Sequence, residues 1–507
     1  MFNYLFIAFS TKFHSIIKFV LTAHYLYIFF PKFGKLMLIY NTFSKTKEEF
    51  IPVNPPNVTF YVCGPTVYDY FHIGNARSFI MADIVRRYLE YKGYNVNFVM
   101  NITDIDDKII NKSKESKKST EEIAKFFTAA FYEDIQKLRI KPAVKNPRAT
   151  EFIQDIIEMI KTLEEKGYAY NVDGNVYYDI TKFKDYGKLS GKNLEELEAG
   201  ARVEVNESKR NPLDFVLWKK AKEGEPSWDS PWGKGRPGWH IECSAMSCKH
   251  LGNTIDIHAG GNDLIFPHHE NEIAQSEAAN ETKFVKYWLH FGFLNIQNEK
   301  MSKSLGNFFT AREILSKYSV EAIRLFFSQT HYRGPLNFSE ELLAAAEKGI
   351  EKIKNLADKV EQEIQKQADD GIYPQFDFKK YYEEFENVMD DDFNTPQAVA
   401  VIFEFVKNVN KVISENEKIN SQFYYDVKKF LSDTAQNVLG IIHFDSLVEN
   451  QKSEAIEDKL IELLINVRLA LKKEKNFALS DFIRDELNKL GIILQDNKEG
   501  TTFKRKR

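Results

Sequence analysis

The feature that most constrains the fold is an apolar strand followed closely by a loop, a helix and a second strand. Val58–Val62 consists of β-branched and aromatic residues, as expected for a buried strand. A loop containing Gly64-Pro65 follows, and a helix is predicted over Ala76–Tyr91, ended by Gly93. Val96–Ile102 reads as the next strand. This order predicts the first half of a parallel α/β sheet.

Composition narrows the class of protein. A chain of 507 residues with 43% hydrophobic residues is expected to form several domains with substantial cores. The net charge of −4 does not exclude RNA as a partner, because RNA binding requires a local basic groove and not a basic total. Three cysteines exclude a disulfide scaffold and indicate a reducing compartment, so we expect the protein to be cytoplasmic.

The first 36 residues differ from the rest of the chain. They are rich in Phe, Ile, Leu and Tyr and contain no acidic residue, but their longest apolar run, Phe19–Phe30, is too short to span a bilayer. One interpretation is translation assigned from an upstream start codon, and the other is a membrane-associating leader. We favour the first, and expect residues 1–36 to be a non-native or unstructured extension and the protein to have no membrane partner.

Two short strings point to phosphate chemistry. His72-Ile73-Gly74-Asn75 lies where a helix follows a strand, and a helix N-terminus offers free N–H groups and a positive dipole end to an anion. Gly74 allows close approach of a nucleotide to the backbone, and His72 and Asn75 carry hydrogen-bond donors. A chance match or a simple helix cap would explain this string taken alone.

The second string is Lys300-Met301-Ser302-Lys303-Ser304, followed by Leu305-Gly306-Asn307. Lysine is a compact charge on a flexible stem, suited to a polar loop that closes over pyrophosphate. An exposed basic turn is the alternative, and the complete pentapeptide argues against it.

Four dispersed residues can form one zinc site. His268 and Glu272 are four apart on a predicted helix and so share one face, while Cys63 ends the first strand and Cys243 lies further along the chain. Two thiolates, an imidazole and a carboxylate make a tetrahedral zinc set. His269 is also within reach of Glu272, and the residues alone do not choose between the two histidines.

Together these residues resemble the cysteinyl-tRNA synthetase family, from about Met37 to the C-terminus. The resemblance implies an ATP-dependent ligase that activates L-cysteine to cysteinyl-adenylate and transfers it to tRNA(Cys). The family usually has His-Ile-Gly-His where this chain has Asn75, which keeps a donor but cannot carry a proton charge. The remaining roles follow by resemblance. They are catalysis by His72, Lys300 and Lys303, ATP binding by Gly74, Asn75, Ser302, Gly261 and Asp263, substrate binding by Thr66, Thr103, Trp239 and His258, and metal binding by Cys63, Cys243, His268 and Glu272.

The resemblance also implies a reason for the metal. The family uses zinc to bind the substrate thiolate, and a soft sulfur ligand separates cysteine from serine where size alone would fail. This predicts no editing domain, one zinc per chain, and ATP with Mg²⁺ as substrate. Three anionic ligands already leave the site near −1, so either covalency dominates or one protein ligand loosens when cysteine enters.

The expected fold class is α/β, with a Rossmann-like parallel-sheet catalytic domain split by an insertion, followed by a helical bundle and a small mixed C-terminal module. Helices are expected over Ser113–Lys166 and Phe266–Ala279, and a late strand of the sheet at Ile255–His258. A further helix is expected to open at Asn394-Thr395-Pro396, where a capping side chain precedes a proline suited to the first turn. The expected divisions are 37–153 and 237–290 for the two halves of the catalytic domain, 154–236 for the insertion, 291–349 for the connecting region, 350–450 for a tRNA-binding bundle and 451–507 for an anticodon-binding module.

Two other functions compete with this hypothesis. A cysteine–sugar ligase shares the catalytic half but lacks the anticodon module, so the long C-terminal region argues against it. A zinc-stabilised RNA-binding protein without catalysis is the other, and the intact His72, Lys300 and Lys303 argue against that. The expected partners are tRNA(Cys), L-cysteine and ATP, and we expect a monomer.

Overall fold

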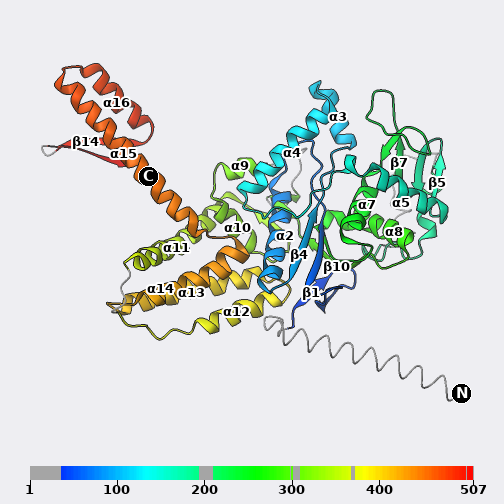
Figure 1. The fold of residues 1–507 in the computed structure, drawn as a ribbon, viewed down its shortest axis with the longest axis horizontal. Coiled ribbons are helices and arrows are strands. Elements are labelled where there is room, and N and C mark those ends of the chain that lie inside the picture. Colours follow the sequence, from blue (N-terminus) through cyan, green and yellow to red (C-terminus); the bar gives the residue numbers. More distant parts are fainter. Residues whose placement is uncertain are drawn as a thin grey trace, which may run out of the picture. The chain divides into compact units, whose positions relative to one another are not determined.

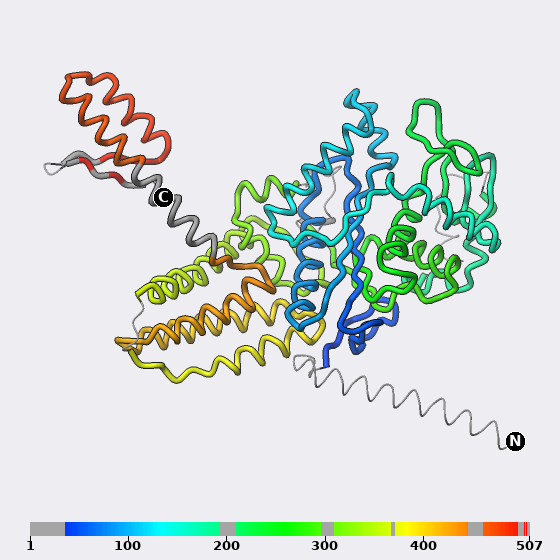
Figure 2. The backbone as a smooth tube through the Cα atoms, viewed as in Figure 1, coloured from blue at the N-terminus to red at the C-terminus, as the bar shows by residue number. Residues whose placement is uncertain are grey.

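The computed structural model describes residues 36–192, 209–296, 299–300, 309–366, 371–497 and 500–505. It divides into two compact units, one ending at Ile442 and the other beginning at His443 (Figures 1 and 2). Except for residue 36, the predicted N-terminal extension lies outside the described residues. Among the helices that the structure describes, none is long and apolar enough to cross a membrane.

A four-stranded parallel sheet lies at the centre of the first unit, in the order β10-β9-β3-β4 (Figure 1). Most residues of its strands are buried because both faces are covered, as in other parallel sheets. The helix α2, Ile73–Tyr91, connects β3 to β4 and provides the strand–loop–helix–strand order expected from the sequence. The strands are β3 (Asn57–Val62), β4 (Asn95–Met100), β9 (Ile255–Gly261) and β10 (Val285–Phe291).

A long insertion separates β4 from β9 in the chain. It contains a second four-stranded sheet, antiparallel and in the order β5-β6-β7-β8, which packs against helix α5 and shares an apolar core with it. The elements between β4 and β9 are α3 (Asp107–Ser116), α4 (Thr120–Lys137), α5 (Ile153–Glu165), β5 (Ala169–Val172), β6 (Asn175–Tyr178), β7 (Phe215–Lys220), β8 (Gly235–Pro237) and α7 (Trp239–Leu251).

The expectation of continuous helix over Ser113–Lys166 is wrong in its middle. Between α4 and α5 the chain is extended and runs parallel to β4, with bridges from Val99 to Lys145 and from Ile102 to Arg148. Pro142 and Pro147 explain this, because proline lacks the N–H that a helix interior needs. The segment therefore covers the outer edge of β4 instead of extending the helix.

The helix expected over Phe266–Ala279 also begins later than predicted. Phe266 has φ −137° and ψ 133°, and the regular helix α8 spans Glu270–Asn280 after a wider turn at Ile265–His269. The residue before a proline is disfavoured in helical conformation, and Pro267 accounts for the break. His268 therefore lies on the turn that leads into α8, while Glu272 lies within α8 itself.

A third sheet, in the order β12-β11-β13, leads from β10 to a helical bundle. The helix expected to open at Asn394-Thr395-Pro396 does so, because the Asn394 side chain accepts from the backbone N–H of Gln397 and proline occupies the first turn. The elements are β11 (Leu294–Ile296), β12 (Glu299–Lys300), α9 (Ala311–Leu315), α10 (Val320–Ser328), β13 (Leu336–Phe338), α11 (Glu340–Gln365), α12 (Phe378–Asp390), α13 (Thr395–Glu415) and α14 (Ser421–Leu431).

Two small antiparallel hairpins complete the chain. In the first unit, the hairpin of β1 (Leu38–Asn41) and β2 (Thr46–Glu49) joins the sheet edge, since Trp288 N–H of β10 donates to Asn41 Oδ1 at 3.0 Å. The second unit consists of α15 (Phe444–Lys473), α16 (Phe477–Lys489) and the hairpin of β14 (Ile492–Asn497) and β15 (Gly500–Arg505). It has the mixed composition expected of the C-terminal module.

A buried charge cluster ties α2 to α10. Asp83 is 1% exposed and lies 2.6 Å from Arg87 Nε and 2.8 Å from Arg324 Nη2, and Lys141 N–H donates to it at 3.0 Å. Burial by itself would raise the pKa of Asp83, but the guanidinium groups of Arg324 and Arg87 outweigh it and hold the pKa below its ordinary value. The carboxylate is therefore ionised in the folded protein.

Replacing Asp83 by asparagine is expected to destabilise the first unit by about 3–5 kcal/mol, because it leaves the fully buried Arg324 without its anion. Urea unfolding followed by circular dichroism measures the change. The control is Asp155→Asn, which breaks the more exposed pair between Lys249 Nζ and Asp155 Oδ1 at 2.7 Å and should cost at most about 1 kcal/mol.

The buried contact between Asp83 and Arg324 also predicts how the stability of the protein depends on pH. A carboxyl group whose pKa is lowered on folding stabilises the protein above its unfolded pKa of about 3.9, and this contribution is lost as the pH falls through the folded pKa. Stability measured from pH 6 downward should therefore fall less steeply in Asp83→Asn than in the wild type. Equal slopes would show that Asp83 does not supply this contribution.

Candidate active site

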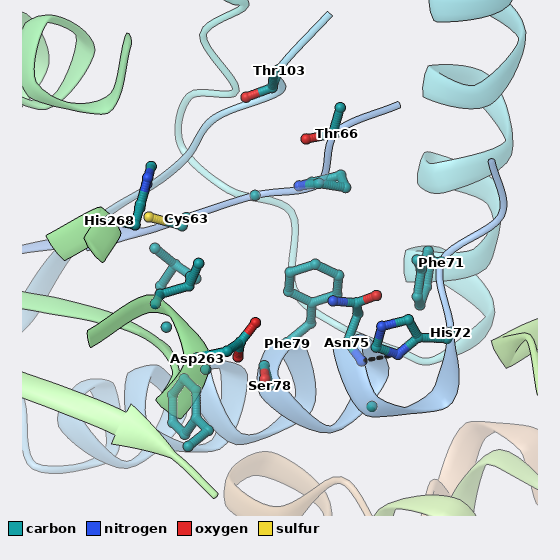
Figure 3. Close-up of a pocket in the computed structure, with 18 of the residues that line it drawn as sticks. Cys63, Thr66, Phe71, His72, Asn75, Ser78, Phe79, Thr103, Asp263 and His268 are labelled. Carbon is teal, nitrogen blue, oxygen red and sulfur yellow. Dashed lines mark hydrogen bonds between the residues drawn. The ribbon is translucent and has the colours of Figure 1, made fainter. Parts of the chain in front are cut away.

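A cavity of about 310 Å³ opens at the carboxyl ends of the parallel strands (Figure 3). Ligand sites of open α/β sheets form at this edge. Residues far apart in the sequence meet here, including Cys63 after β3, Thr103 after β4 and Asp263 after β9. The sequence-predicted residues that line it are Cys63, Thr66, His72, Gly74, Asn75, Thr103, Trp239, Cys243, Gly261, Asp263 and His268.

One side of the cavity is the N-terminus of α2. His72 caps the helix, and its Nδ1 accepts from the backbone N–H of Asn75 at 3.1 Å, as the dashed line in Figure 3 shows. The first turn contains no acidic residue, so nothing there repels an anion. The backbone N–H groups and the helix dipole of this turn suit a phosphate group.

The chain that follows the Lys300–Ser304 string returns to this same helix start. Thr310 bridges to His72, the backbone N–H of Ile73 donates to Phe309 O at 3.0 Å, and the N–H of Ala311 donates to Phe71 O at 3.0 Å. Ser302 and Lys303 lie outside the described residues, and only the backbone of Lys300, in β12, is described. The structure thus places the chain that follows the second string, from Phe309 onward, beside the first string.

The turn after β9 forms a second wall. A Cβ atom on Gly261 would lie 2.5 Å from Asp263 Oδ1, so only glycine lets this carboxylate fold back against the strand end. Figure 3 shows the Asp263 and Ser78 side chains beside each other at the cavity. A carboxylate and a hydroxyl here are suitable partners for ribose hydroxyl groups.

The third wall carries the residues expected near the amino acid. Thr66 and Thr103 are joined by a backbone bridge, and Thr103 Oγ1 donates to Glu242 Oε2 at 3.0 Å. Trp239 is 40% exposed and stacks on His268, with ring centroids 4.2 Å apart. This indole forms a flat apolar surface next to the metal cluster.

His258 is placed differently from the other predicted substrate-binding residues, which line the cavity. It is fully buried and is not among the residues that line the cavity, and its Nε2 lies 2.8 Å from Glu272 Oε2. This contact orients Glu272 so that Oε1 faces Cys63 and His268. The predicted contact of His258 with substrate stays a prediction, while its contact with the carboxylate is a feature of the structure.

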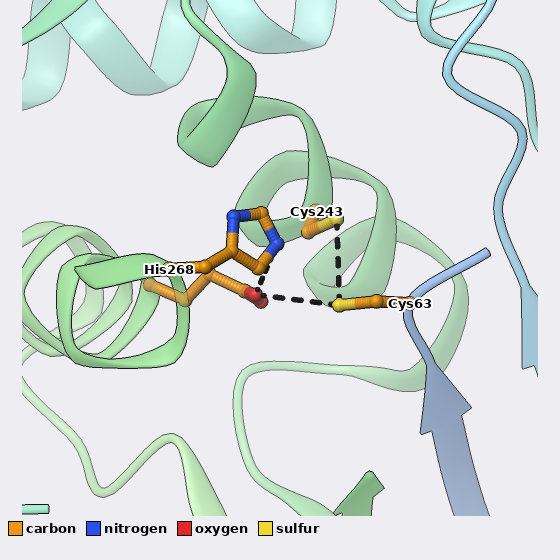
Figure 4. A group of neighbouring side chains, drawn as sticks. Cys63, Cys243 and His268 are labelled. Atoms are coloured by element: carbon orange, nitrogen blue, oxygen red, sulfur yellow. Dashed lines mark hydrogen bonds and ion pairs between the residues drawn. The ribbon is translucent and has the colours of Figure 1, made fainter. Parts of the chain in front are cut away.

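Cys63, Cys243, His268 and Glu272 converge at the base of the cavity (Figure 4), and their ligand atoms lie within 4.8 Å of one another. The two sulfurs are 3.9 Å apart, compared with about 3.8 Å for two thiolates on one tetrahedral zinc with bonds of about 2.3 Å. Cys63 Sγ lies 3.6 Å from Glu272 Oε1, compared with about 3.5 Å by the same calculation. The four residues therefore fit a tetrahedral zinc ion.

The charges of the cluster also suit a cation. Cys63 donates a hydrogen bond that lowers the pKa of Cys243 to about 6, whereas burial raises the pKa of Cys63 itself. Burial would raise the pKa of Glu272, but His258 and His268 lower it to about 2. Burial would likewise lower the pKa of His268, but Glu272 and Cys243 raise it to about 10. A divalent ion would take the place of the proton that His268 holds.

The state of His258, and not the partners of the two rings, separates His268 from His269 as a metal ligand, because His269 Nδ1 also lies 2.8 Å from a partner, His290 Nε2. A second group that could hold a metal consists of Cys63, His258, His269 and Glu272. In that group His258 would bind through Nε2 and carry its proton on Nδ1, which is buried without a hydrogen-bond partner among the described residues. In the first group His268 Nδ1 lies 2.8 Å from His240 Nδ1, which leaves Nε2 for the metal. The geometry favours His268.

Sequence reasoning missed His240 and Glu242. Burial lowers the pKa of His240 well below its ordinary value, so its neutral ring can accept from His268 and fix that ring's tautomer. Both residues lie on α7 with Cys243, and His240 is one helical turn before Cys243. That spacing is a signal that could have identified His240.

Comparison with known proteins agrees with this architecture. Residues 49–348 match the family model for the class I (C) tRNA synthetase catalytic domain, and residues 384–443 match the DALR domain. The family match over residues 49–348, together with the split parallel sheet and the cavity at its edge, identifies the protein as a class I aminoacyl-tRNA synthetase. The predicted fold class is therefore confirmed.

Full-length relatives narrow the assignment. The chain is 51% identical over 474 residues to the cysteine–tRNA ligase of Clostridioides difficile (strain 630), covering 92% of this chain and 100% of the relative. It is 51% identical over 473 residues to that of Thermococcus onnurineus (strain NA1), covering 92% and 98%. The chain belongs to the cysteine–tRNA ligase family of ATP-dependent aminoacyl-tRNA ligases, as its motifs predict.

The similarity of this chain to solved structures extends only to the fold. Mycobacterium tuberculosis methionyl-tRNA synthetase in complex with methionyl-adenylate aligns with a TM-score of 0.57 at 15% identity, covering 75% of this chain and 89% of the other. The leucyl-tRNA synthetase of a ternary complex from Agrobacterium radiobacter K84 aligns with a TM-score of 0.56 at 10% identity, covering 77% and 85%.

Proposed function

We propose that the protein joins L-cysteine to tRNA(Cys) in two steps within the cavity of Figure 3. In the first step the cysteine carboxylate attacks the α-phosphorus of ATP, and the bond to the β-phosphate bridging oxygen breaks. Pyrophosphate leaves with the electron pair, and cysteinyl-adenylate remains. In the second step a ribose hydroxyl at the 3′ end of the tRNA attacks the acyl carbon, and AMP leaves.

The observation that carries this proposal is that one cavity joins the start of α2 to the Cys63–Cys243–His268–Glu272 cluster. ATP, with its Mg²⁺, would place its phosphates at His72, Gly74 and Asn75, and its ribose near Asp263. The charge that builds on the phosphate oxygens would be met by donors already in place. Lys300, Ser302 and Lys303 would act on the pyrophosphate from the loop that rejoins α2 at Thr310.

Cys63, Cys243, His268 and Glu272 would hold zinc, and when bound it supplies a soft Lewis acid for the thiolate of the substrate. Trp239 would cover the substrate side chain, and Thr66 and Thr103 would contact its amino and carboxylate groups. His258 and His240 hold Glu272 and His268 in place through their ring nitrogens. Serine has a hard, weakly acidic hydroxyl group and would bind poorly in such a pocket.

The regions after the catalytic domain would bind the tRNA. We propose that the bundle at 350–450 contacts the tRNA body and that the module at 451–507 reads the anticodon. In the observed unit that begins at His443, α15 runs continuously through residue 451, so this helix would connect the two functions.

Two assays test the proposed function. Purified protein should exchange pyrophosphate into ATP in the presence of cysteine but not serine, and should then charge tRNA(Cys). Exchange without charging, with transfer to an amino sugar instead, would indicate the cysteine–sugar ligase. Binding of tRNA without any exchange would indicate the non-catalytic RNA-binding protein, and either result would contradict the proposal.

A further inference from the structure

A buried arginine joins the two phosphate-binding segments, and no step of the proposed reaction uses it. Arg77 lies on α2 two residues after Asn75 and is 1% exposed. It lines neither the cavity nor the metal cluster. Burial lowers its pKa only to about 10, so the guanidinium carries its charge at neutral pH.

The guanidinium of Arg77 binds backbone oxygens on two converging segments. Nη1 donates to Gly292 O at 2.7 Å and to Phe293 O at 2.9 Å, and Nη2 donates to His331 O at 3.3 Å and to Gly334 O at 2.7 Å. Within the described part of the chain, no carboxylate pairs with the guanidinium of Arg77. Four carbonyls on one buried cation form a specific and rigid joint, because the fork of Arg fixes their directions.

The two segments that Arg77 joins are themselves closely packed. The backbone N–H of Gly292 donates to Tyr332 O at 2.8 Å, and a Cβ atom on Gly292 would lie 2.2 Å from Gly334 O. Phe293 O accepts from Leu336 N–H at 3.0 Å as well as from Arg77. Each contact depends on the others, so loss of the guanidinium would loosen the whole junction.

The segment around Gly292 forms one wall of the cavity. It leads directly into the strand that pairs with Lys300 of the second string. Phe291, Gly292, Phe293 and Leu294 line the cavity. Leu294 then begins β11, in which Asn295 pairs with the backbone of Lys300. Hydrogen bonds therefore connect α2, one helical turn after its start, to the backbone of Lys300.

We propose that Arg77 is a positioning residue for the reaction with ATP: it fixes the Phe291–Leu294 wall and the β11–β12 hairpin against α2. The inference rests on the proposed function, because it assigns nucleotide handling to these segments. Cysteine contacts lie instead on the side of Cys63, Trp239 and Cys243, which Arg77 does not touch. The expected defect is therefore selective for ATP.

The test compares Arg77→Met and Arg77→Lys with the control Arg86→Met. Arg86 lies on the same helix and also donates to a backbone carbonyl, Pro142 O at 2.7 Å, but does not reach the cavity. In cysteine-dependent exchange, Arg77→Met should lower kcat/KM for ATP by about 10- to 100-fold, the scale of a 1 Å misplacement. The KM for cysteine and the zinc content should not change, and Arg77→Lys should recover only part of the loss.

Gly292→Ala gives an independent test if Arg77→Met folds poorly. Its added methyl group would push Gly334 away while leaving the guanidinium intact, and the same ATP-selective loss is expected. Hydrogen–deuterium exchange of peptides from residues 285–296 should be faster in both variants than in wild type and in Arg86→Met.

The outcomes separate this inference from the proposed function. Absence of cysteine-dependent exchange in the wild type would reject the proposed function, while faster deuterium exchange confined to this wall would still support the joint. Equal losses for ATP and cysteine, or a lower Tm with unchanged kinetics and unchanged deuterium exchange, would overturn the role of Arg77.

Discussion

Replacing Cys243 by serine is expected to remove bound zinc and to lower cysteine-dependent ATP–pyrophosphate exchange by at least about 100-fold. The thiol of Cys243 lies 3.9 Å from that of Cys63 at the base of the cavity, and its pKa of about 6 supplies a thiolate at neutral pH. A serine hydroxyl stays protonated and is a hard ligand, so the affinity for zinc and the selection of cysteine should fall together. Metal analysis and exchange kinetics on the same preparation measure both.

The matched control is Cys248→Ser, on the same helix. The Cys248 thiol accepts from Asn280 Nδ2 at 3.6 Å and belongs to neither group of metal-binding side chains found among the described residues. This variant should retain zinc and activity. If Cys243→Ser kept its metal and suffered only in folding, the ligand assignment would be wrong.

Replacing Lys303 by alanine is expected to slow adenylate formation by about 100- to 1000-fold with the KM for cysteine unchanged. The role of Lys303 comes from the Lys300–Ser304 string, and Lys303 itself lies outside the described residues. The described ends of this region support the expectation, because Lys300 pairs with Asn295 and Thr310 bridges to His72. Under the proposed function, Lys303 would act on phosphates bound at the start of α2.

Single-turnover formation of cysteinyl-adenylate measures the rate for Lys303→Ala, and titration with cysteine measures affinity. Lys317→Ala is the control, since Lys317 Nζ pairs with Glu340 at 3.0 Å on the surface and should affect neither quantity. A loss of cysteine affinity with normal adenylate chemistry would contradict the assigned role of Lys303.

Local sequence patterns predicted the parts of the fold that local physics determines. The strand over Val58–Val62, the helix after His72 and the proline-started helix at Asn394 each depend on neighbouring residues, and each is present. Prolines explain the two failures. Pro147 lies in the segment that is extended along β4, and Pro267 delays the start of α8.

Contacts between residues that are far apart in the chain could not be predicted from the sequence. Which histidine would bind the metal depends on the contacts of His258 and His240, and His240 is 28 residues from His268 in the chain. The four carbonyls that bind Arg77 lie between 215 and 257 residues away from it. Side-chain identity gave the chemistry of the site, whereas its geometry needed the tertiary structure.

The most direct test of the central claim is zinc X-ray absorption spectroscopy of the purified full-length protein, alone and with cysteine or serine. We predict one zinc per chain with two sulfur ligands, a third sulfur ligand when cysteine is added, and no change with serine. If the number of nitrogen and oxygen ligands of zinc stays the same when cysteine binds, covalent bonding to sulfur dominates. If that number falls, one protein ligand loosens when cysteine enters. Protein that contains no zinc and still activates cysteine in preference to serine would contradict the account.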